Sequence, residues 1–313
     1  MLFRKIIPYA EIDPTEEAKW VIEGLIQKGG VNFITGEPKT HKSFLRKFLV
    51  ASALSGKTVF DQFEVKEAPQ RVLTLIIEDR IAWERRTMDC MFDSLGYLLD
   101  PPIGVCKPFG FKLNNSSHIK QLIALVKREG YDFVTIDPLI EFHSADENNA
   151  SEMSAVTVAL HQLAQFATLL VVHHSAKSQN RPGMAQGSVE RSLRGSGVIS
   201  GASSLTMELT RIGLSAAHKL RKSGKETESL DDIKLLLDIN DTWCWELEGA
   251  LTPERVRSYI LGHPGLTTGD LARRLGKRKE LVVEIVEELL DCEEIAKAEG
   301  PRQRQEYFPF NSE

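Results

Sequence analysis

Short apolar runs alternate with amphipathic stretches through the middle of the chain, from about residue 31 to residue 207. Four runs have the apolar, β-branched character of buried strands, and they cover residues 31–34, 72–77, 133–136 and 169–172. Between them, apolar residues recur every three or four positions, as in amphipathic helices, over residues 43–54, 82–95, 118–128 and 152–166. The alternation predicts an α/β fold built from βαβ units around a mostly parallel sheet.

The pattern changes towards the end of the chain. Residues 233–239 and 242–247, separated by Asn240 and Asp241, predict an antiparallel hairpin that ends the core. From Thr252 the apolar spacing becomes helical, and a two-stranded wing is predicted near residues 294–309. The helices are expected near residues 253–261, 268–275 and 278–291. We therefore expect two domains, residues 1–250 and 251–313.

Composition narrows the class of protein without indicating a function. With 42% hydrophobic and 27% charged residues, the 313-residue chain is neither disordered nor collagen-like. No apolar stretch approaches the roughly 20 residues of a membrane span, and residues 1–14 lack the apolar run of a secretory signal. Its four cysteines are scattered, so we expect a cytoplasmic protein without a disulfide framework. A net charge of −5 argues against a protein that coats nucleic acid, although it allows a local basic channel.

A candidate phosphate-binding loop follows the first predicted strand and opens a helix. It runs from Gly36 to Ser43 and includes Lys39, Thr40, His41 and Lys42. Backbone N–H groups of such a loop surround a β-phosphate, the lysine neutralises β- and γ-phosphate oxygens, and the serine hydroxyl holds Mg²⁺. His41 stands where the consensus has glycine. The alternative is an ordinary strand–turn–helix with an exposed Lys42.

Carboxylates follow two further predicted strands. Asp137 ends one of them, where a nucleotide-binding sheet places a second magnesium-contacting group. Glu78 and Asp79 follow the other, where a carboxylate can polarise the water that attacks the γ-phosphate. As alternatives, Asp137 before a proline is a turn signal, and Asp79 is a helix cap beside a solvated Glu78.

Together these strand ends resemble the signature motifs of the RecA-fold ATPases of the plasmid RepA type, which include ring-shaped hexameric replicative helicases. The resemblance is most specific in residues 136–153, 171–177 and 194–198, in that order after the loop and the Glu-Asp pair. It implies a RecA-like P-loop core that binds ATP and Mg²⁺.

By this resemblance, Lys42 and Ser43 take the phosphate and magnesium roles, Glu78 is the catalytic carboxylate, and Asp137 is the magnesium-side acid. His174 corresponds to the residue that senses nucleotide state, and Arg194 to an arginine finger that reaches the γ-phosphate of a neighbouring subunit. Taken alone, His173 and His174 are equally consistent with a structural pair, and Arg194 with a surface charge or an intrachain ion pair.

A finger supplied by a neighbour requires a head-to-tail interface, and such interfaces close into rings when the rotation permits. The resemblance to this family implies a ring of six subunits.

A polar segment between His174 and Arg194 carries an excess of basic residues. The segment contains the basic residues Lys177, Arg181 and Arg191 but only one acidic residue, Glu190. No aromatic residue occurs between positions 175 and 192. In the related ring helicases the corresponding loop lines a central channel. We expect salt-sensitive, sequence-independent contact with single-stranded DNA rather than base stacking. The alternative is a surface loop with incidental charge.

The tail after residue 250 resembles a winged helix-turn-helix. The third predicted helix carries an acidic face, whereas basic residues gather at its start and in the wing. Contact with DNA through the turn and wing, and docking of a replication partner on the acidic face, both remain open.

The combined interpretation is an ATP-driven hexameric DNA helicase or translocase that serves replication of a plasmid, phage or other mobile element. Two alternatives are a DNA-dependent ATPase for loading, recombination or repair that does not unwind, and a winged-helix regulator with a weak nucleotide site.

Overall fold

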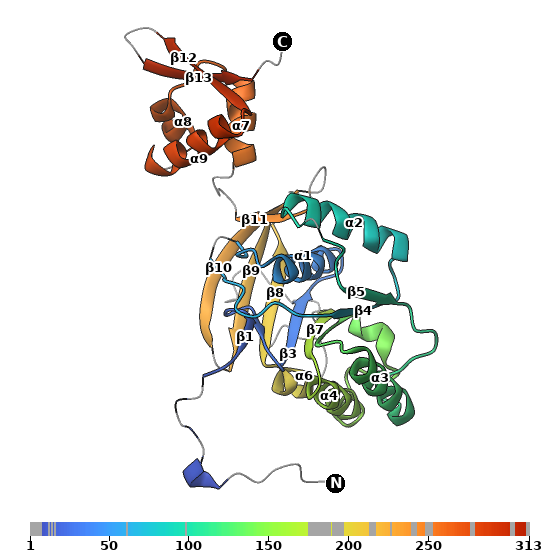
Figure 1. The fold of residues 1–313 in the computed structure, drawn as a ribbon. Coiled ribbons are helices and arrows are strands. Elements are labelled where there is room, and N and C mark those ends of the chain that lie inside the picture. The colour runs from blue at the N-terminus through green and yellow to red at the C-terminus, as the bar shows by residue number, and fades with distance from the viewer. Residues whose placement is uncertain are drawn as a thin grey trace. The chain divides into compact units, whose positions relative to one another are not determined.

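The computed structural model describes residues 8–11, 13, 15, 17–60, 62–97, 99–174, 189, 197–212, 217–225, 227–238, 243–247, 253–275, 279–300 and 304–310. The chain divides into two compact units, Met1–Glu248 and Gly249–Glu313 (Figure 1). No helix within the described ranges is long and apolar enough to cross a membrane.

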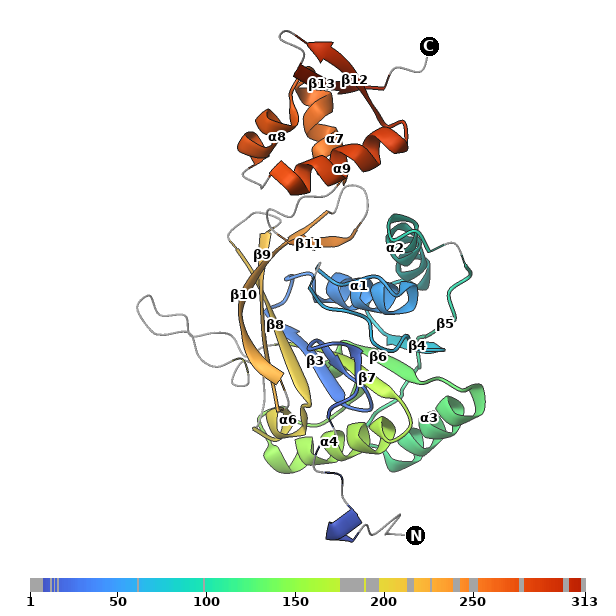
Figure 2. The same ribbon diagram turned by 60° about the vertical axis from the view of Figure 1, so that its left-hand side comes forward.

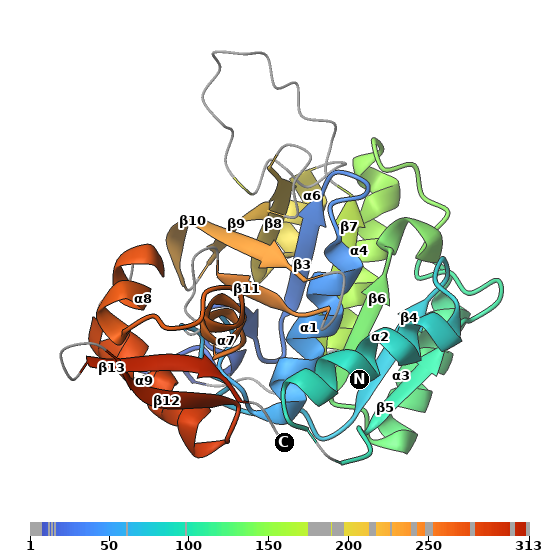
Figure 3. The same cartoon turned by 90° about the horizontal axis from the view of Figure 1, so that it is seen from above.

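In the described part of the first unit, nine strands form one sheet in the order β11-β10-β9-β8-β3-β7-β6-β4-β5, which Figure 3 shows from β10 across to β5. The strands are β3 (Val31–Gly36), β4 (Val72–Ile76), β5 (Ile103–Cys106), β6 (Phe133–Asp137), β7 (Thr168–His174), β8 (Leu205–Arg211), β9 (Ala217–Gly224), β10 (Thr227–Leu237) and β11 (Trp245–Leu247). From β5 to β8 all neighbours are parallel, whereas β9, β10 and β11 are antiparallel. The predicted α/β fold with a mostly parallel sheet and antiparallel C-terminal strands is confirmed.

Helices cover both faces of the sheet (Figure 2). One hydrophobic core joins it to α1 (Lys42–Ser55) and α2 (Ile81–Ser94), and a second joins it to α3 (Ser116–Glu129), the 3₁₀ helix η2 (Leu139–Phe142), α4 (Ala150–Ala164) and α6 (Gly197–Ala202). Because both faces are covered, every residue of β3, β4 and β6 is buried, and each strand carries apolar residues on both of its faces. A short 3₁₀ helix, η1 (Tyr9–Glu11), and the strands β1 (Trp20–Ile22) and β2 (Ile26–Gln27) precede the sheet.

The four strands and four helices predicted in the middle of the chain are present. The predicted antiparallel pair also forms, between β10 and β11, although the Asn240-Asp241 turn lies outside the described residues. The sequence pattern did not predict β1, β2, β5, β8 and β9. β5 is a short edge strand whose residues are only partly buried, and β9 contains His218, Lys219, Arg221 and Lys222 in a polar-looking segment. Pairing with neighbours, rather than local pattern, makes these segments strands.

The second unit has a small core of its own. It comprises α7 (Pro253–Gly262), α8 (Thr268–Leu275) and α9 (Lys279–Asp291), followed by β12 (Ile295–Gly300) and β13 (Arg304–Pro309), which pair antiparallel. Val256, Leu271 and Val286 of the helices pack with Ile295 and Tyr307 of the strands. Three helices and a two-stranded sheet occur where they are predicted; their assignment as a winged helix-turn-helix stays a prediction.

Candidate active site

The carboxyl ends of the central parallel strands meet at one edge of the sheet. The register pairs Gly36 of β3 with His174 of β7, and Ile76 of β4 with Asp137 of β6. The loop before α1 and the Glu78-Asp79 pair after β4 therefore lie at the same edge. This is the edge at which open α/β sheets bind ligands.

The backbone of the loop from Gly36 to Ser43 has positive φ values at three positions, Gly36, Lys39 and His41. Gly36 has a φ of 156°, and a Cβ built there would lie 2.2 Å from the carbonyl oxygen of Leu209 in β8, so only glycine fits. Lys39 and His41 have left-handed backbones, with φ values of 66° and 62°. Together these conformations turn the chain from the end of β3 into the first turn of α1.

Lys42 is buried in this loop. Its Nζ atom donates hydrogen bonds to the carbonyl oxygens of Gly36, at 2.9 Å, and Glu37, at 2.7 Å, and the residue is only 5% exposed. It is therefore not the exposed lysine of the alternative interpretation. Burial lowers the pKa of Lys42 to about 8, although the charges of Asp137, Glu78 and Glu37 oppose this shift. Thr40 supports the turn by donating to the carbonyl of Glu37 at 2.8 Å.

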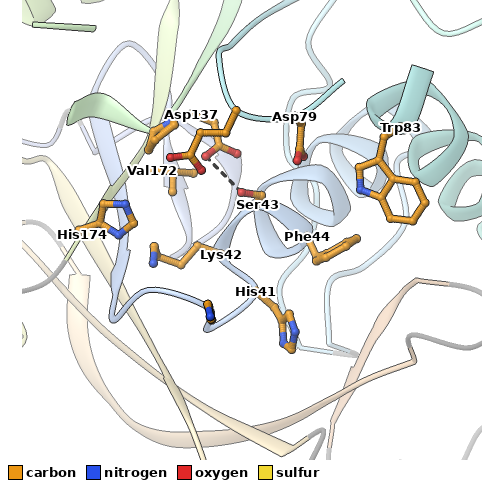
Figure 4. A pocket seen from close by; sticks show the side chains of 12 residues that line it. His41, Lys42, Ser43, Phe44, Asp79, Trp83, Asp137, Val172 and His174 are labelled. Atoms are coloured by element: carbon orange, nitrogen blue, oxygen red, sulfur yellow. Dashed lines mark hydrogen bonds between the residues drawn. The ribbon is translucent and has the colours of Figure 1, made fainter. Parts of the chain in front are cut away.

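Ser43 and Asp137, which the sequence predicts as magnesium ligands, are neighbours in the structure (Figure 4). The Ser43 hydroxyl donates to Oδ1 of Asp137 at 3.2 Å. The other carboxylate oxygen, Oδ2, accepts a hydrogen bond from Nε of Arg46 at 2.9 Å. Asp137 is therefore held on one side and presents its second oxygen towards the first turn of α1.

Sequence analysis missed a buried ionic network beneath this site. Arg46, which is 1% exposed, also bonds Oε1 of Glu84 in α2 at 2.7 Å. Lys47 is fully buried, and its Nζ atom lies 3.0 Å from Oε2 of Glu84 and 3.2 Å from Oδ2 of Asp79. Burial raises the pKa of Glu84, but the charges of Arg46 and Lys47 outweigh it and hold the pKa below its usual value. Charged residues on a helix usually face water, so helical spacing gave no signal of this network.

Glu78 lines the same site. Among the described residues it makes no hydrogen bond or ion pair. Partial burial raises the pKa of Glu78, as do the charges of Asp137, Glu141 and Asp79, whereas Lys42 lowers it. Asp79, in contrast, is paired with Lys47. The capping alternative for Asp79 is wrong, because the N-cap of α2 is Arg80 and has no side-chain cap.

A cavity of about 170 Å³ is lined by Lys42, Ser43, Glu78, Asp79 and Asp137. His174 lines it, whereas the preceding His173 is fully buried and has a ring nitrogen 3.8 Å from Glu147. Successive strand residues point to opposite faces, so the two histidines have separate environments and are not one structural pair. Arg194, Lys177, Arg181 and Arg191 lie outside the described residues.

One wall of the cavity is aromatic, which sequence analysis also missed. Phe44 and Trp83 line it (Figure 4). Phe44 stacks on Trp243, with ring centroids 4.9 Å apart, and Trp83 meets Trp243 edge-on at 5.4 Å. The site thus combines a charged end, suited to phosphate, with an aromatic wall.

A phosphate loop between a buried strand and a helix, facing carboxylates at neighbouring strand ends, defines the class of P-loop nucleotide-hydrolysing ATPases. The chain belongs to the AAA domain family, whose model matches residues 10–180, more than half of the sequence. No curated protein sequence matches it significantly.

Among solved structures, the chain is similar to a KaiC-like protein from the hyperthermophilic archaeon Pyrococcus horikoshii OT3. Sequence identity is 14% and the TM-score is 0.45, over 73% of this chain and 93% of the other.

Proposed function

We propose that this ATPase is a hexameric DNA helicase or translocase that acts on single-stranded DNA during replication of a plasmid, phage or other mobile element. The observation that supports its motor chemistry is the convergence of Lys42, Ser43, Asp137 and Glu78 on one cavity. A regulator with a degenerate nucleotide site would not need a carboxylate opposite the phosphate loop.

The residues present fit ATP with Mg²⁺. The Lys42 ammonium lies inside the loop, where it would meet β- and γ-phosphate oxygens. The Ser43 hydroxyl and the Asp137 carboxylate supply oxygen ligands, which Mg²⁺ prefers and usually combines with phosphate oxygens and water. Within the described ranges no three His, Cys, Asp or Glu side chains are grouped to hold a metal. The bound ion would neutralise charge on the phosphate oxygens.

Glu78 is the proposed general base. A water oxygen attacks the γ-phosphorus, the bond to the β–γ bridging oxygen breaks, and the water proton passes to the Glu78 carboxylate. Among the described residues no ionic partner occupies this carboxylate, and its raised pKa makes it a stronger base than a free glutamate.

The remaining roles rest on the resemblance to the RepA-type ATPases. His174 would report the state of the nucleotide, since it lines the cavity at the end of β7. Arg194 would act as the finger towards the neighbouring subunit, and Lys177, Arg181 and Arg191 would follow the phosphates of single-stranded DNA.

ATP hydrolysis with and without single-stranded DNA tests the motor. DNA should stimulate hydrolysis, and a forked duplex should be unwound. Lys42→Ala should abolish both activities, whereas Lys57→Ala, at an exposed position just beyond α1, should leave both unchanged. Stimulated hydrolysis without unwinding would favour the loading or repair alternative. A chain that leaves ATP intact in the presence of DNA would contradict the proposal.

Subunit mixing tests the ring. Lys42→Ala and Arg194→Ala chains should each be inactive, but an exchanging mixture should recover some activity because a shared interface then contains one intact site. Native mass measurement with an ATP analogue and single-stranded DNA should give a hexamer. Absence of recovery in a freely exchanging mixture would contradict a finger supplied by the neighbour.

The proposed winged helix-turn-helix has two candidate roles. Glu284, Glu287 and Glu288 of α9 are exposed and suit a basic surface on a replication partner, whereas the basic residues before α9 suit DNA. Removing the residues after 250 should leave ATP hydrolysis intact. Loss of DNA affinity in the truncated chain would favour the DNA role; unchanged affinity would favour the docking role.

A further inference from the structure

The phosphate loop holds a histidine immediately before its lysine. The His41 backbone is left-handed, with φ 62° and ψ 27°, a conformation that disfavours residues with a Cβ atom. His41 is the N-cap residue of α1, yet its side chain makes no capping hydrogen bond. The imidazole therefore does not stabilise the helix in the way that a usual N-cap side chain does.

The imidazole instead contacts a second histidine, 177 residues further along the chain. Nδ1 of His41 lies 3.1 Å from Nε2 of His218, and the ring centroids are 5.1 Å apart. Hydrogen bonding between two imidazoles requires one ring nitrogen to donate and the other to accept. His218 is fully buried, and Trp245 packs edge-on against it with centroids 4.8 Å apart.

His218 belongs to the antiparallel part of the sheet. It lies on β9, where its register partners are Arg211 of β8 and Leu235 of β10. The hydrogen bonds of Lys42 and Thr40 run to carbonyls within the loop. The His41–His218 contact, in contrast, joins the loop to a strand on the far side of β8 from β3.

We propose that His41 and His218 are positioning residues, and that their hydrogen bond holds the phosphate loop in the shape that receives the triphosphate. This inference rests on the proposed function, because it takes the loop as the nucleotide site. A glycine adopts the left-handed conformation freely, so a loop with glycine there needs no such support. With histidine, the side chain that makes the conformation unfavourable also supplies the bond that maintains it.

A double-mutant cycle on the full chain tests the proposal. His218→Leu should weaken binding of a fluorescent ATP analogue about tenfold, roughly 1.4 kcal/mol. In a His41→Gly background the same replacement should change the dissociation constant less than twofold, because the bond is already absent. His218→Gln, which can still hydrogen-bond His41, should retain most of the affinity. Equal losses in both backgrounds would indicate general damage to the sheet and would overturn the proposal, as would no loss in either.

Amide hydrogen exchange without nucleotide provides a second measurement. Exchange over residues 36–43 should become faster on His218→Leu in the natural chain, and should not change further in the His41→Gly background. Faster exchange with unchanged nucleotide affinity would show a tether that does not position the loop, which overturns the proposal. Failure of the proposed function has a different signature: the natural chain would not bind the analogue, while exchange would still report on the tether.

Discussion

Two helices of similar length cover opposite faces of the sheet, and their buried sides differ in chemistry. α4 packs with Met153, Val156 and Leu160 and buries no charged side chain. α1 buries Leu45 and Leu49 as well, but it also buries Lys42, Arg46 and Lys47. An apolar stripe is sufficient for a helix that only covers a sheet. α1 must also bring cations to the carboxylates at the sheet edge.

The buried cations of α1 come with matched partners. Arg46 meets Asp137 and Glu84, and Lys47 meets Glu84 and Asp79. Desolvation makes such charges costly, and the partners offset that cost only while all are present. We therefore expect substitutions in α1 to destabilise the protein by leaving buried charges unpaired, and substitutions in α4 to destabilise it by leaving cavities.

The largest expected effect lies at the edge that α1 serves. Glu78→Gln should lower ATP turnover by about 10²–10⁴-fold, because the general base is lost. ATP binding should persist, since Lys42 and Ser43 are intact. Single-turnover hydrolysis and analogue binding measure the two effects separately. Loss of ATP affinity in this variant would count against the assignment of Glu78 as the base.

Breaking the network in α1 should be the next largest effect. Arg46→Leu should lower the free energy of unfolding by about 3–5 kcal/mol, because Glu84 and Asp137 lose a buried partner. Adding Glu84→Leu should recover part of this loss. In α4, Leu160→Ala should lower it by about 2–5 kcal/mol by leaving a cavity. Urea denaturation measures all three variants. If the second replacement in α1 adds to the loss instead of reducing it, the network is not the main reason for the effect.

A pH effect distinguishes Lys42 from an ordinary surface lysine. Its pKa of about 8 means that the free site is protonated below pH 8 and loses its proton as the pH rises. Phosphate oxygens restore the charged form, so ATP binding at pH 9 should take up close to one proton, and at pH 7 about one tenth of a proton. Calorimetry in buffers of different ionisation enthalpy measures this uptake. Equal uptake at both pH values would contradict the lowered pKa.

The smallest effect is expected at an arginine that resembles Arg46 only in type. Arg85 of α2 forms an ion pair with Asp89, at 2.7 Å, but its side chain is 65% exposed. Arg85→Leu should leave the urea midpoint nearly unchanged, because exposed pairs contribute little. A loss as large as that of Arg46→Leu would mean that burial does not determine the difference.

Several parts of the fold and site were predictable because their signals are local. Residues 31–34 and 133–136 are apolar on both faces, which predicts strands covered on both sides. Gly36, Lys42 and Ser43 have the spacing of a phosphate loop, and Asp137 ends a strand. For β9 the pattern is insufficient, because His218 and Lys222 are buried by pairing and packing with distant segments.

Sequence by itself determined the central strands β3, β4, β6 and β7, the helices between them and the chemical types at their ends, because periodicity and loop spacing depend only on near neighbours. Tertiary structure alone decided which charges are buried. Arg46 and Arg85 are the same type of residue. Only the carboxylates of Glu84 and Asp137, which come from other elements, make the burial of Arg46 stable. In the same way His41 departs from the loop consensus in the sequence, and only the folded sheet brings His218 to its side chain.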